Sequence, residues 1–331
     1  MGNGFQKEAE DGLVDQLKDK LLAKIKVLSE TIWDQRANRT EIDLWLHNFQ
    51  SDDKEKQEKE RLHALYLLSQ FMYFASNEMR VLLHSMYRDL IRYPIVERIR
   101  KSNEDTTDIS FINEEFKNEL SKTRFLGVGN PSESGTHLLY YFRQESVLEK
   151  KLFINSHEIF SHDNGPQATL AFPTIKRYVF IDDFSGGGTQ AVRYLKNVVK
   201  LIKELNQGIE VWYFVLFANE SALKHIRDNT KINKCEAIFK LDDTYKCFGE
   251  NSRYTPDEEI LDMDFTHEMT RSYGDKLQPE HPLGYADNQL LLGFFHNTPN
   301  NTLPIIWFDE KNDYEWSPIF RRYPKNYGDK A

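Results

Sequence analysis

The first part of the chain, from about residue 8 to residue 104, has the apolar spacing of helices. In GLVDQLKDKLLAKIKVLSETIWDQ, apolar positions recur every three or four residues and form one stripe: Leu13, Leu17, Leu21, Ile25, Leu28 and Ile32. Thr40 is the expected cap of the helix EIDLWLHNF. The charge run DDKEKQEKE predicts a solvated first turn or linker. It precedes a periodic stretch from Arg61 to about Arg92, which we expect Pro94 to interrupt.

From about Phe125 the pattern changes, and short apolar runs alternate with helical periods. This alternation is typical of βα units around a parallel sheet. We expect three helices in this part of the chain: THLLYYFRQESV, the helix that follows the glycines near residue 187, and NESALKHIRDN. The expected strands are RFLGVG, KKLFIN, RYVFID, IEVWYFVLFA and CEAIFKLD. IEVWYFVLFA is apolar at nearly every position, as a strand buried on both faces should be.

These patterns predict an α/β fold in which a Rossmann-like parallel-sheet core carries two extensions. We expect a helical N-terminal region at 1–110, the α/β core at 111–250, and a mixed C-terminal extension at 251–331 packed on the core as a hood. A chain of 331 residues is long enough for one large α/β domain with an extension, or for two domains.

Composition and charge narrow the class of partner. The chain is 40% hydrophobic and 29% charged, with a formal net charge of −9 at pH 7. A global attraction to nucleic acid is therefore not expected, although a local basic patch stays open. Cys235 and Cys247 lack the spacing of a metal or redox motif and predict free thiols. Because the sequence shows neither a secretory signal nor an apolar window long enough to span a bilayer, we expect a cytoplasmic protein with no membrane partner.

An acidic pair and a glycine turn follow one apolar run, in RYVFIDDFSGGGTQ. Asp182 and Asp183 come at the carboxyl end of a predicted strand, where ligands bind in parallel sheets. Ser185 and Thr189 offer hydroxyl groups, and three glycines between them let backbone N–H groups converge on an anion: Gly186, Gly187 and Gly188. A phosphate beside two carboxylates favours a ligand that also presents neutral hydroxyls or a divalent cation. A phosphorylated ribose with Mg²⁺ satisfies both conditions.

Other glycine and metal motifs fit this stretch less well. No Lys follows the glycines, as a P-loop requires, and the GxGxxG spacing of a dinucleotide site is absent. The histidines lack the spacing of a zinc site. A plain strand-to-helix turn with an N-cap remains the structural alternative.

VFIDDFSGGGT resembles the phosphoribosyl-diphosphate (PRPP) binding motif of type I phosphoribosyltransferases. The resemblance implies that Asp182 and Asp183 are catalytic residues that contact the ribose 2- and 3-hydroxyls, and that 185–189 binds the 5-phosphate. Mg²⁺ would come with PRPP, with the two aspartates as further candidates to contact it. An upstream loop would bind pyrophosphate through Asn130, Ser132, Ser134, Gly135 and Thr136. Residues 156–173 would form a flap that closes as a lid.

Over most of residues 40–310, the chain is similar to phosphoribosyltransferase-like proteins of bacterial conflict and defence systems. The shared segments are LWLHNF, GNPSESG, IDDFSGGGTQ and HNTPNNTLPIIW. This similarity implies a glycosyltransferase of the phosphoribosyltransferase type, or an effector acting on an N-glycosidic bond, in antiviral defence. The N-terminal helices would then offer a docking surface for a protein partner.

Two alternatives come from other classes of protein. The chain could be a non-catalytic sensor of PRPP or a nucleotide that regulates a partner. It could also be a structural subunit with a vestigial loop, against which the intact Asp182, Asp183 and Thr189 argue. If the chain is a transferase, polar side chains beside aromatic residues suit a nucleobase acceptor, whereas forming turns is the ordinary role of such residues. The candidates are the Asp287 carboxylate and the amides of Asn288, Gln289, Asn297, Asn300 and Asn301.

Overall fold

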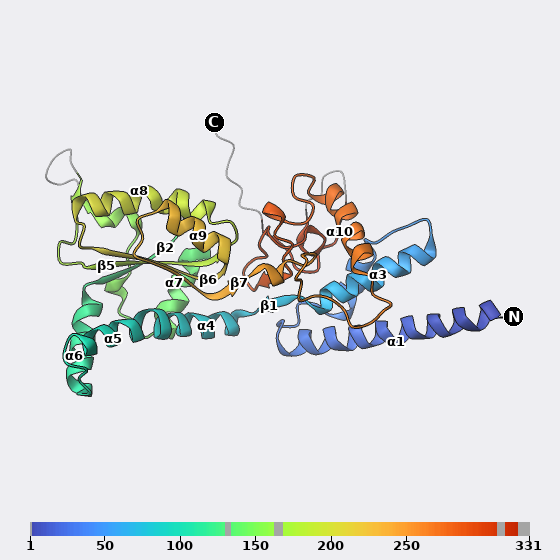
Figure 1. Ribbon diagram of the computed structural model, residues 1–331, viewed down its shortest axis with the longest axis horizontal. Coiled ribbons are helices and arrows are strands. Elements are labelled where there is room, and N and C mark those ends of the chain that lie inside the picture. Colours follow the sequence, from blue (N-terminus) through green and yellow to red (C-terminus); the bar gives the residue numbers. More distant parts are fainter. Residues whose placement is uncertain (1, 130–133, 162–167, 310–314, 324–331) are drawn as a thin grey trace. The chain divides into compact units, whose positions relative to one another are not determined.

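The computed structural model describes residues 2–129, 134–161, 168–309 and 315–323, with the backbone alone for 2–11 and 134–137. The chain divides into two compact units (Figure 1). The terminal unit combines Met1–Ser76 with Asp242–Ala331, and the sheet unit is Asn77–Leu241. This division differs from the three consecutive ranges expected from the sequence, because the N-terminal helices pack with the C-terminal segment.

The terminal unit is mainly helical. Two short strands, β1 (Met72–Phe74) and β8 (Leu292–Phe294), pair in parallel, with Met72 opposite Leu292. Strand β1 therefore divides the periodic stretch expected from Arg61 to about Arg92, since its aromatic residues favour an extended backbone once β8 supplies a partner. The other elements are α1 (Gly2–Thr31), α2 (Arg39–Leu46), α3 (Lys54–Ser69), η4 (Asp243–Tyr245), α10 (Met263–Leu277), η5 (Tyr285–Asp287) and α11 (Pro304–Trp307).

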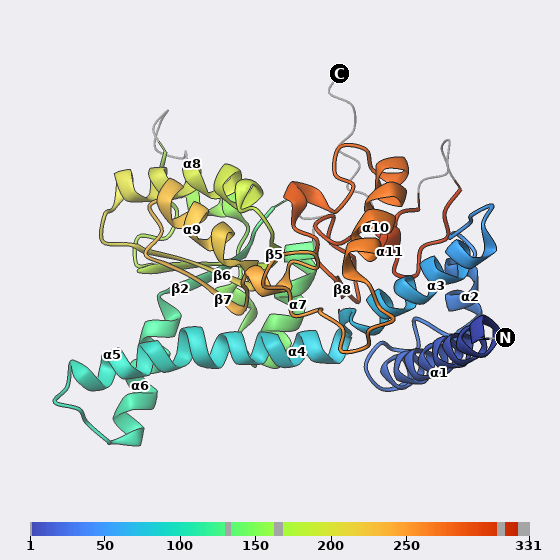
Figure 2. The same ribbon diagram turned by 45° about the vertical axis from the view of Figure 1, so that its right-hand side comes forward.

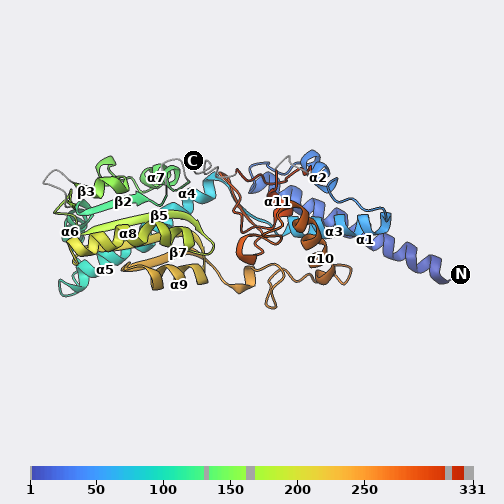
Figure 3. The ribbon, with the colours of Figure 1, turned by 90° about the horizontal axis from the view of Figure 1, so that it is seen from above.

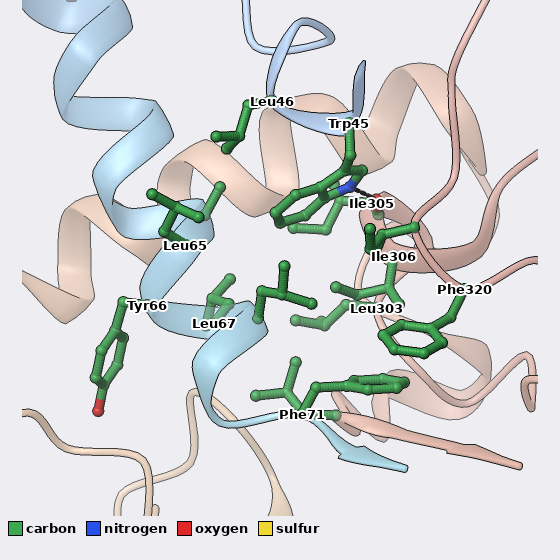
Figure 4. Packing of buried hydrophobic residues seen from close by; sticks show 14 of the residues in the cluster. Trp45, Leu46, Leu65, Tyr66, Leu67, Phe71, Leu303, Ile305, Ile306 and Phe320 are labelled. Carbon is green, nitrogen blue, oxygen red and sulfur yellow. Dashed lines mark hydrogen bonds between the residues drawn. The ribbon is translucent and has the colours of Figure 1, made fainter. Parts of the chain in front are cut away.

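Segments from both ends of the chain build the core of the terminal unit. Figure 4 shows the Trp45 indole N–H donating to the backbone carbonyl of Ile305, at 2.7 Å, and the ring of Phe71 stacked on that of Phe320. The ring centroids of this second pair lie 4.5 Å apart. The predicted stripe of α1 contributes its middle to this core: Leu17, Leu21 and Ile25 are buried, whereas Leu13 and Ile32 are exposed.

Side-chain caps fix where α2 and α3 begin. The predicted cap Thr40 is wrong: Asn38 caps α2, accepting from the Glu41 N–H at 3.1 Å while Glu41 accepts from the Asn38 N–H at 2.9 Å. This reciprocal pair satisfies two backbone donors, which Thr40 could not do from inside the helix. Asp53 caps α3, so the charge run forms a solvated first turn as predicted.

The sheet unit contains a four-stranded parallel sheet in the order β2-β5-β6-β7, which confirms the predicted α/β core. Figures 1 and 3 show α8 and α9 on one face of the sheet and α7 on the other. Strand β6 is buried along nearly its whole length, as its composition predicted. The elements are β2 (Thr123–Gly127), α7 (Ser134–Glu145), β5 (Arg177–Ser185), α8 (Thr189–Leu205), β6 (Glu210–Asn219), α9 (Glu220–Asn229) and β7 (Lys234–Leu241).

A long helical segment leads into this sheet. Helix α4 (Ser76–Ser85), the π-helix η1 (Met86–Arg92) and α5 (Tyr93–Lys101) follow one another along one axis (Figure 2) and precede α6 (Ile109–Ser121). The expectation that Pro94 interrupts this helix is wrong. Proline has no N–H to donate within the helix. The turn before it is wound in π geometry, with the Tyr93 N–H donating to the Arg88 carbonyl, so the axis continues through Pro94.

The segment between α7 and β5 departs from the sequence-based expectation in one place. KKLFIN forms the short 3₁₀ helix η2 (Lys150–Leu152) and a single parallel bridge between Phe153 and Phe125, rather than a full strand. The candidate flap contains η3 (Ser156–Ile159) and an antiparallel pair, β3 (Phe160–Ser161) with β4 (Thr169–Leu170). Residues 162–167 of that flap lie outside the described ranges. No helix in the described part of the chain is long and apolar enough to cross a membrane.

Candidate ligand site at the carboxyl edge of the sheet

Strand β5 carries the acidic pair beyond the end of its neighbour β2. Gly127 is the last residue of β2 and lies opposite Ile181. The expected strand RYVFID is longer in the structure, since β5 continues to Ser185 and pairs with β6, Asp182 opposite Val215. The acidic residues therefore lie at the carboxyl edge of the sheet, supported on one side by β6.

Three backbone and side-chain donors hold the two carboxylates. Asp182 accepts from the Asp183 N–H through Oδ1 and from the Tyr213 hydroxyl through Oδ2, both at 3.0 Å. Asp183 accepts from the Phe184 N–H through Oδ1 at 2.9 Å. Asp183 is 9% exposed, and Asp182 is partly buried. The pair is thus built into the strand end rather than free in solvent.

The electrostatics of this edge favour added protons or a cation. Burial raises the pKa of Asp182 well above its ordinary value, and the neighbouring Asp183 carboxylate raises it further. The hydrogen bond from Tyr213 acts in the opposite direction. Burial, followed by the negative charge of Asp182, raises the pKa of the Tyr213 phenol, so the hydroxyl keeps its proton and acts as a donor.

The glycine turn has one residue that only glycine can fill well. Gly188 has a φ of +76°, and a Cβ there would lie 2.8 Å from the Ala222 carbonyl oxygen of α9. Gly187 is exposed and open, whereas Gly186 is buried. Gly188 therefore brings the start of α8 against α9, and an exposed turn is left in front of it.

Helix α8 begins at Thr189, as predicted, and its first turn meets the acidic edge. Its N-cap, Gly188, makes no side-chain cap. The N–H groups of a first helical turn attract anions, and the helix dipole adds to this attraction. Ser185 is buried at the end of β5, and Thr189 is exposed. The turn consequently offers backbone donors beside two carboxylates.

The predicted pyrophosphate loop falls partly outside the described residues. Asn130 and Ser132 lie there, while Ser134, Gly135 and Thr136 open α7, of which the backbone alone is described at this point. Because β2 and β5 are parallel neighbours, their carboxyl ends lie at the same edge. The two loops expected to bind one ligand thus leave the sheet side by side.

Four of the amides considered for a nucleobase make contacts inside the terminal unit, and Asn288 donates to the Ala286 carbonyl oxygen at 3.1 Å. Gln289 is 5% exposed and accepts from the Phe248 N–H at 2.9 Å. Asn301 donates to the Tyr285 carbonyl, and Asn297 accepts from the Thr298 and Tyr323 N–H groups. These contacts shape the local turns, which favours the structural role of these amides.

Tyr213 is the contributor that the sequence interpretation missed. It lies within the apolar run IEVWYFVLFA, where a tyrosine is indistinguishable from any other core-filling aromatic residue. Only the pairing of β5 with β6 brings its hydroxyl to Asp182.

The sheet and its edge define a protein of the open parallel α/β class, in which ligands bind beyond the carboxyl ends of the strands. The chain belongs to the PRTase-CE family, whose family model matches residues 42–322. This result confirms the predicted phosphoribosyltransferase-like class. No curated protein matches the chain.

Two solved structures are similar to part of the chain. The xanthine-guanine-hypoxanthine phosphoribosyltransferase of Helicobacter pylori is 10% identical, with a TM-score of 0.26, over 52% of this chain and 89% of that one. The orotate phosphoribosyltransferase from Aeropyrum pernix is 13% identical, with a TM-score of 0.23, over 39% of this chain and 73% of that one.

Proposed function

We propose that this protein binds PRPP, or a nucleotide with the same phosphoribosyl group, and transfers that group to an acceptor. One observation carries the proposal: the Asp182–Asp183 pair and the N-terminal turn of α8 meet at the carboxyl edge of a parallel sheet. Membership of a phosphoribosyltransferase-like family supports the same class of ligand.

Each part of the edge has a proposed role. The carboxylates of Asp182 and Asp183 accept hydrogen bonds from the ribose 2- and 3-hydroxyls. The backbone from Ser185 to Thr189, including the turn Gly186–Gly188, donates to the 5-phosphate. The loop after β2, with Ser134, Gly135 and Thr136 at the start of α7, receives the pyrophosphate.

The donor set fits a magnesium ion that arrives with the ligand. Among the described residues, no three or more His, Cys, Asp or Glu side chains lie together as a metal-binding group. Mg²⁺ often uses one or two carboxylates together with substrate phosphates and water. Asp182 and Asp183 could supply carboxylate oxygens of this kind. When bound, the ion neutralises charge on the leaving pyrophosphate.

In the proposed transfer, the bond from ribose C1 to the pyrophosphate oxygen breaks, and its electron pair leaves with pyrophosphate. The sugar passes through an oxocarbenium-like state, as in glycoside chemistry. An acceptor nucleophile then bonds to C1, and its proton passes to the Asp183 carboxylate at the same edge of the sheet. Asp182 and Asp183 fix the ribose and stabilise its positive charge.

Calorimetric titration of the full chain with PRPP, with and without MgCl₂, tests the ligand. We expect magnesium-dependent binding to the wild type and its loss in Asp182→Asn/Asp183→Asn. The matched control is Asp228→Asn, an exposed carboxylate on α9 that pairs with Lys224. A folded wild type that does not bind PRPP would overturn the proposal.

Release of pyrophosphate from bound PRPP, with candidate acceptors added, tests catalysis separately. Release that requires both aspartates supports a transferase. Tight binding without release would favour the alternative, a sensor of PRPP or a nucleotide that regulates a partner.

We also propose that this chemistry serves bacterial antiviral defence and that a protein partner docks on the N-terminal helices. The segments LWLHNF, GNPSESG and IDDFSGGGTQ resemble those of phosphoribosyltransferase-like proteins in bacterial conflict and defence systems, and this resemblance supports the role. Plating phage on bacteria that express this protein together with the genes next to its own tests the defence role, with the Asp182→Asn/Asp183→Asn variant as comparison. Equal plaque numbers with wild type, variant and empty vector would contradict a defence role.

A further inference from the structure

The hydroxyl of Tyr213 is a buried polar group behind the ligand edge. Tyr213 is 0% exposed on β6, and its ring packs in the cluster that also contains Phe180 and Val215. A buried phenol hydroxyl destabilises the folded protein unless it has a hydrogen-bond partner. The partner here is Oδ2 of Asp182 at 3.0 Å, and the Ser185 side chain makes a further hydrogen bond. Both partners belong to the proposed ligand site.

These contacts fix the orientation of the Asp182 carboxylate. The terminal torsion of an aspartate is broad, so an unsupported carboxylate turns easily. Here Oδ1 is held by the Asp183 N–H and Oδ2 by Tyr213. Each carboxylate oxygen has a second lone pair, and Asp182 is only partly buried. The carboxylate can therefore accept another hydrogen bond while its plane stays fixed.

We propose that Tyr213 is a positioning residue that orients the Asp182 carboxylate to accept a hydrogen bond from one ribose hydroxyl of the ligand. The inference rests on the proposed function. Tyr213 does not touch the ligand itself, because its side chain is fully buried. Its partners are the Asp182 carboxylate and the Ser185 side chain, and only the backbone of Ser185 has a proposed role in binding phosphate. Its contribution should therefore appear in the recognition of a sugar hydroxyl and not in the recognition of phosphate.

Tyr178 provides a matched control in the adjacent strand. It is also 0% exposed and belongs to the same core cluster. Its hydroxyl is buried but has no hydrogen-bond partner among the described residues. Tyr178→Phe and Tyr213→Phe therefore remove the same atom from the same core, and only the second change removes a contact to Asp182.

The test is calorimetric titration of the full chain with D-ribose 5-phosphate and with its 2-deoxy and 3-deoxy analogues. These ligands carry no pyrophosphate, so their binding does not depend on a magnesium ion at that group. We expect Tyr213→Phe to bind ribose 5-phosphate about tenfold more weakly, the loss typical of one charge-assisted hydrogen bond. For the analogue that lacks the hydroxyl recognised by Asp182, Tyr213→Phe and the wild type should bind equally. Tyr178→Phe should match the wild type for all three sugars.

The possible outcomes separate this inference from the proposed function. Equal weakening for all three sugars, or no weakening, would overturn the positioning role while leaving ligand binding intact. No binding of ribose 5-phosphate or PRPP to the wild type would overturn the proposed function, and this inference with it. If Tyr213 acts through Asp182, then adding Tyr213→Phe to Asp182→Asn should cause little further loss. Additive losses would contradict the inference.

Discussion

The guanidinium group of Arg177 donates from Nε to the carboxylate of Glu210 at 2.9 Å, although only 2% of its side chain is exposed. Arg177 also donates to the Thr123 hydroxyl at 3.2 Å and lies over the Trp212 ring, 4.4 Å from its centroid. This network joins the amino ends of β2, β5 and β6, at the edge opposite to the acidic pair. The network stabilises the pairing of β5 with β2 and β6, and this pairing places Asp182 beside Tyr213.

Arg177 also pairs with the Glu119 carboxylate of α6 at 3.5 Å. We therefore expect Arg177→Met to destabilise the sheet unit by about 3 kcal/mol, because it leaves the half-buried Glu119 and Glu210 carboxylates with fewer partners. Urea denaturation followed by far-UV circular dichroism measures the loss. The control is Arg88→Met on η1, since Arg88 pairs with Asp89 in solvent. Equal stability of the two variants would show that the buried network is not needed.

The imidazole of His63 gives the terminal unit a predicted dependence on pH. It is 0% exposed; its Nδ1 lies 2.7 Å from the Lys59 carbonyl oxygen, and its Nε2 accepts from the Asp262 N–H at 3.0 Å. This geometry requires a neutral ring with its proton on Nδ1. Burial lowers the pKa of His63, although the Lys59 hydrogen bond opposes this effect.

As the pH falls, the unfolded chain therefore takes up a proton on His63 at a higher pH than the folded chain does. Its contribution to stability is complete above about pH 6.5 and is lost as the pH falls below that value towards the lower folded pKa. Chemical denaturation at pH 7.5, 6.5 and 5.5 should show this slope, and His63→Gln should reduce it. The exposed control His47→Gln should keep the wild-type slope; a slope unchanged in His63→Gln would refute the assignment.

Two glycines of the turn, the exposed Gly187 and the buried Gly188, should respond differently to alanine. Gly188→Ala places a Cβ 2.8 Å from the Ala222 carbonyl oxygen at a φ of +76°, so we expect a loss of about 1–3 kcal/mol. Gly187→Ala meets only the Thr189 Oγ1 at 4.0 Å, and stability should hardly change. Thermal melting of both variants decides the matter; similar melting temperatures would mean that α8 and α9 adjust freely.

Local sequence patterns were sufficient for most of the sheet unit. The apolar run of β6 predicted a strand buried on both faces, and the amphipathic period of α8 predicted a helix lying on the sheet, and the structure has both. The acidic pair and the start of α8 at Thr189 could be located because turn chemistry is written in consecutive residues.

Contacts between distant residues could not be predicted in the same way. The pairing of β1 with β8 joins Met72 to Leu292, and no local period encodes such a partner. The hydrogen bond from Tyr213 to Asp182 depends on strand register, which is set by packing across the whole sheet. At Pro94 the local rule against helical proline did not apply, because Pro94 lies in the first turn of α5, directly after a π turn that the Tyr93 N–H closes on the Arg88 carbonyl.

The terminal unit is assembled from two segments that the sheet unit separates along the chain. A ribosome delivers Met1–Ser76 before Asn77–Leu241, and only after both the Ile305 and Phe320 side chains that complete the core of the terminal unit. The sheet unit can thus fold while the early helices still expose Trp45 and Leu65. The core of the terminal unit therefore cannot be completed until the residues after Leu241 are synthesised, which makes the order of translation part of how this protein reaches its native state.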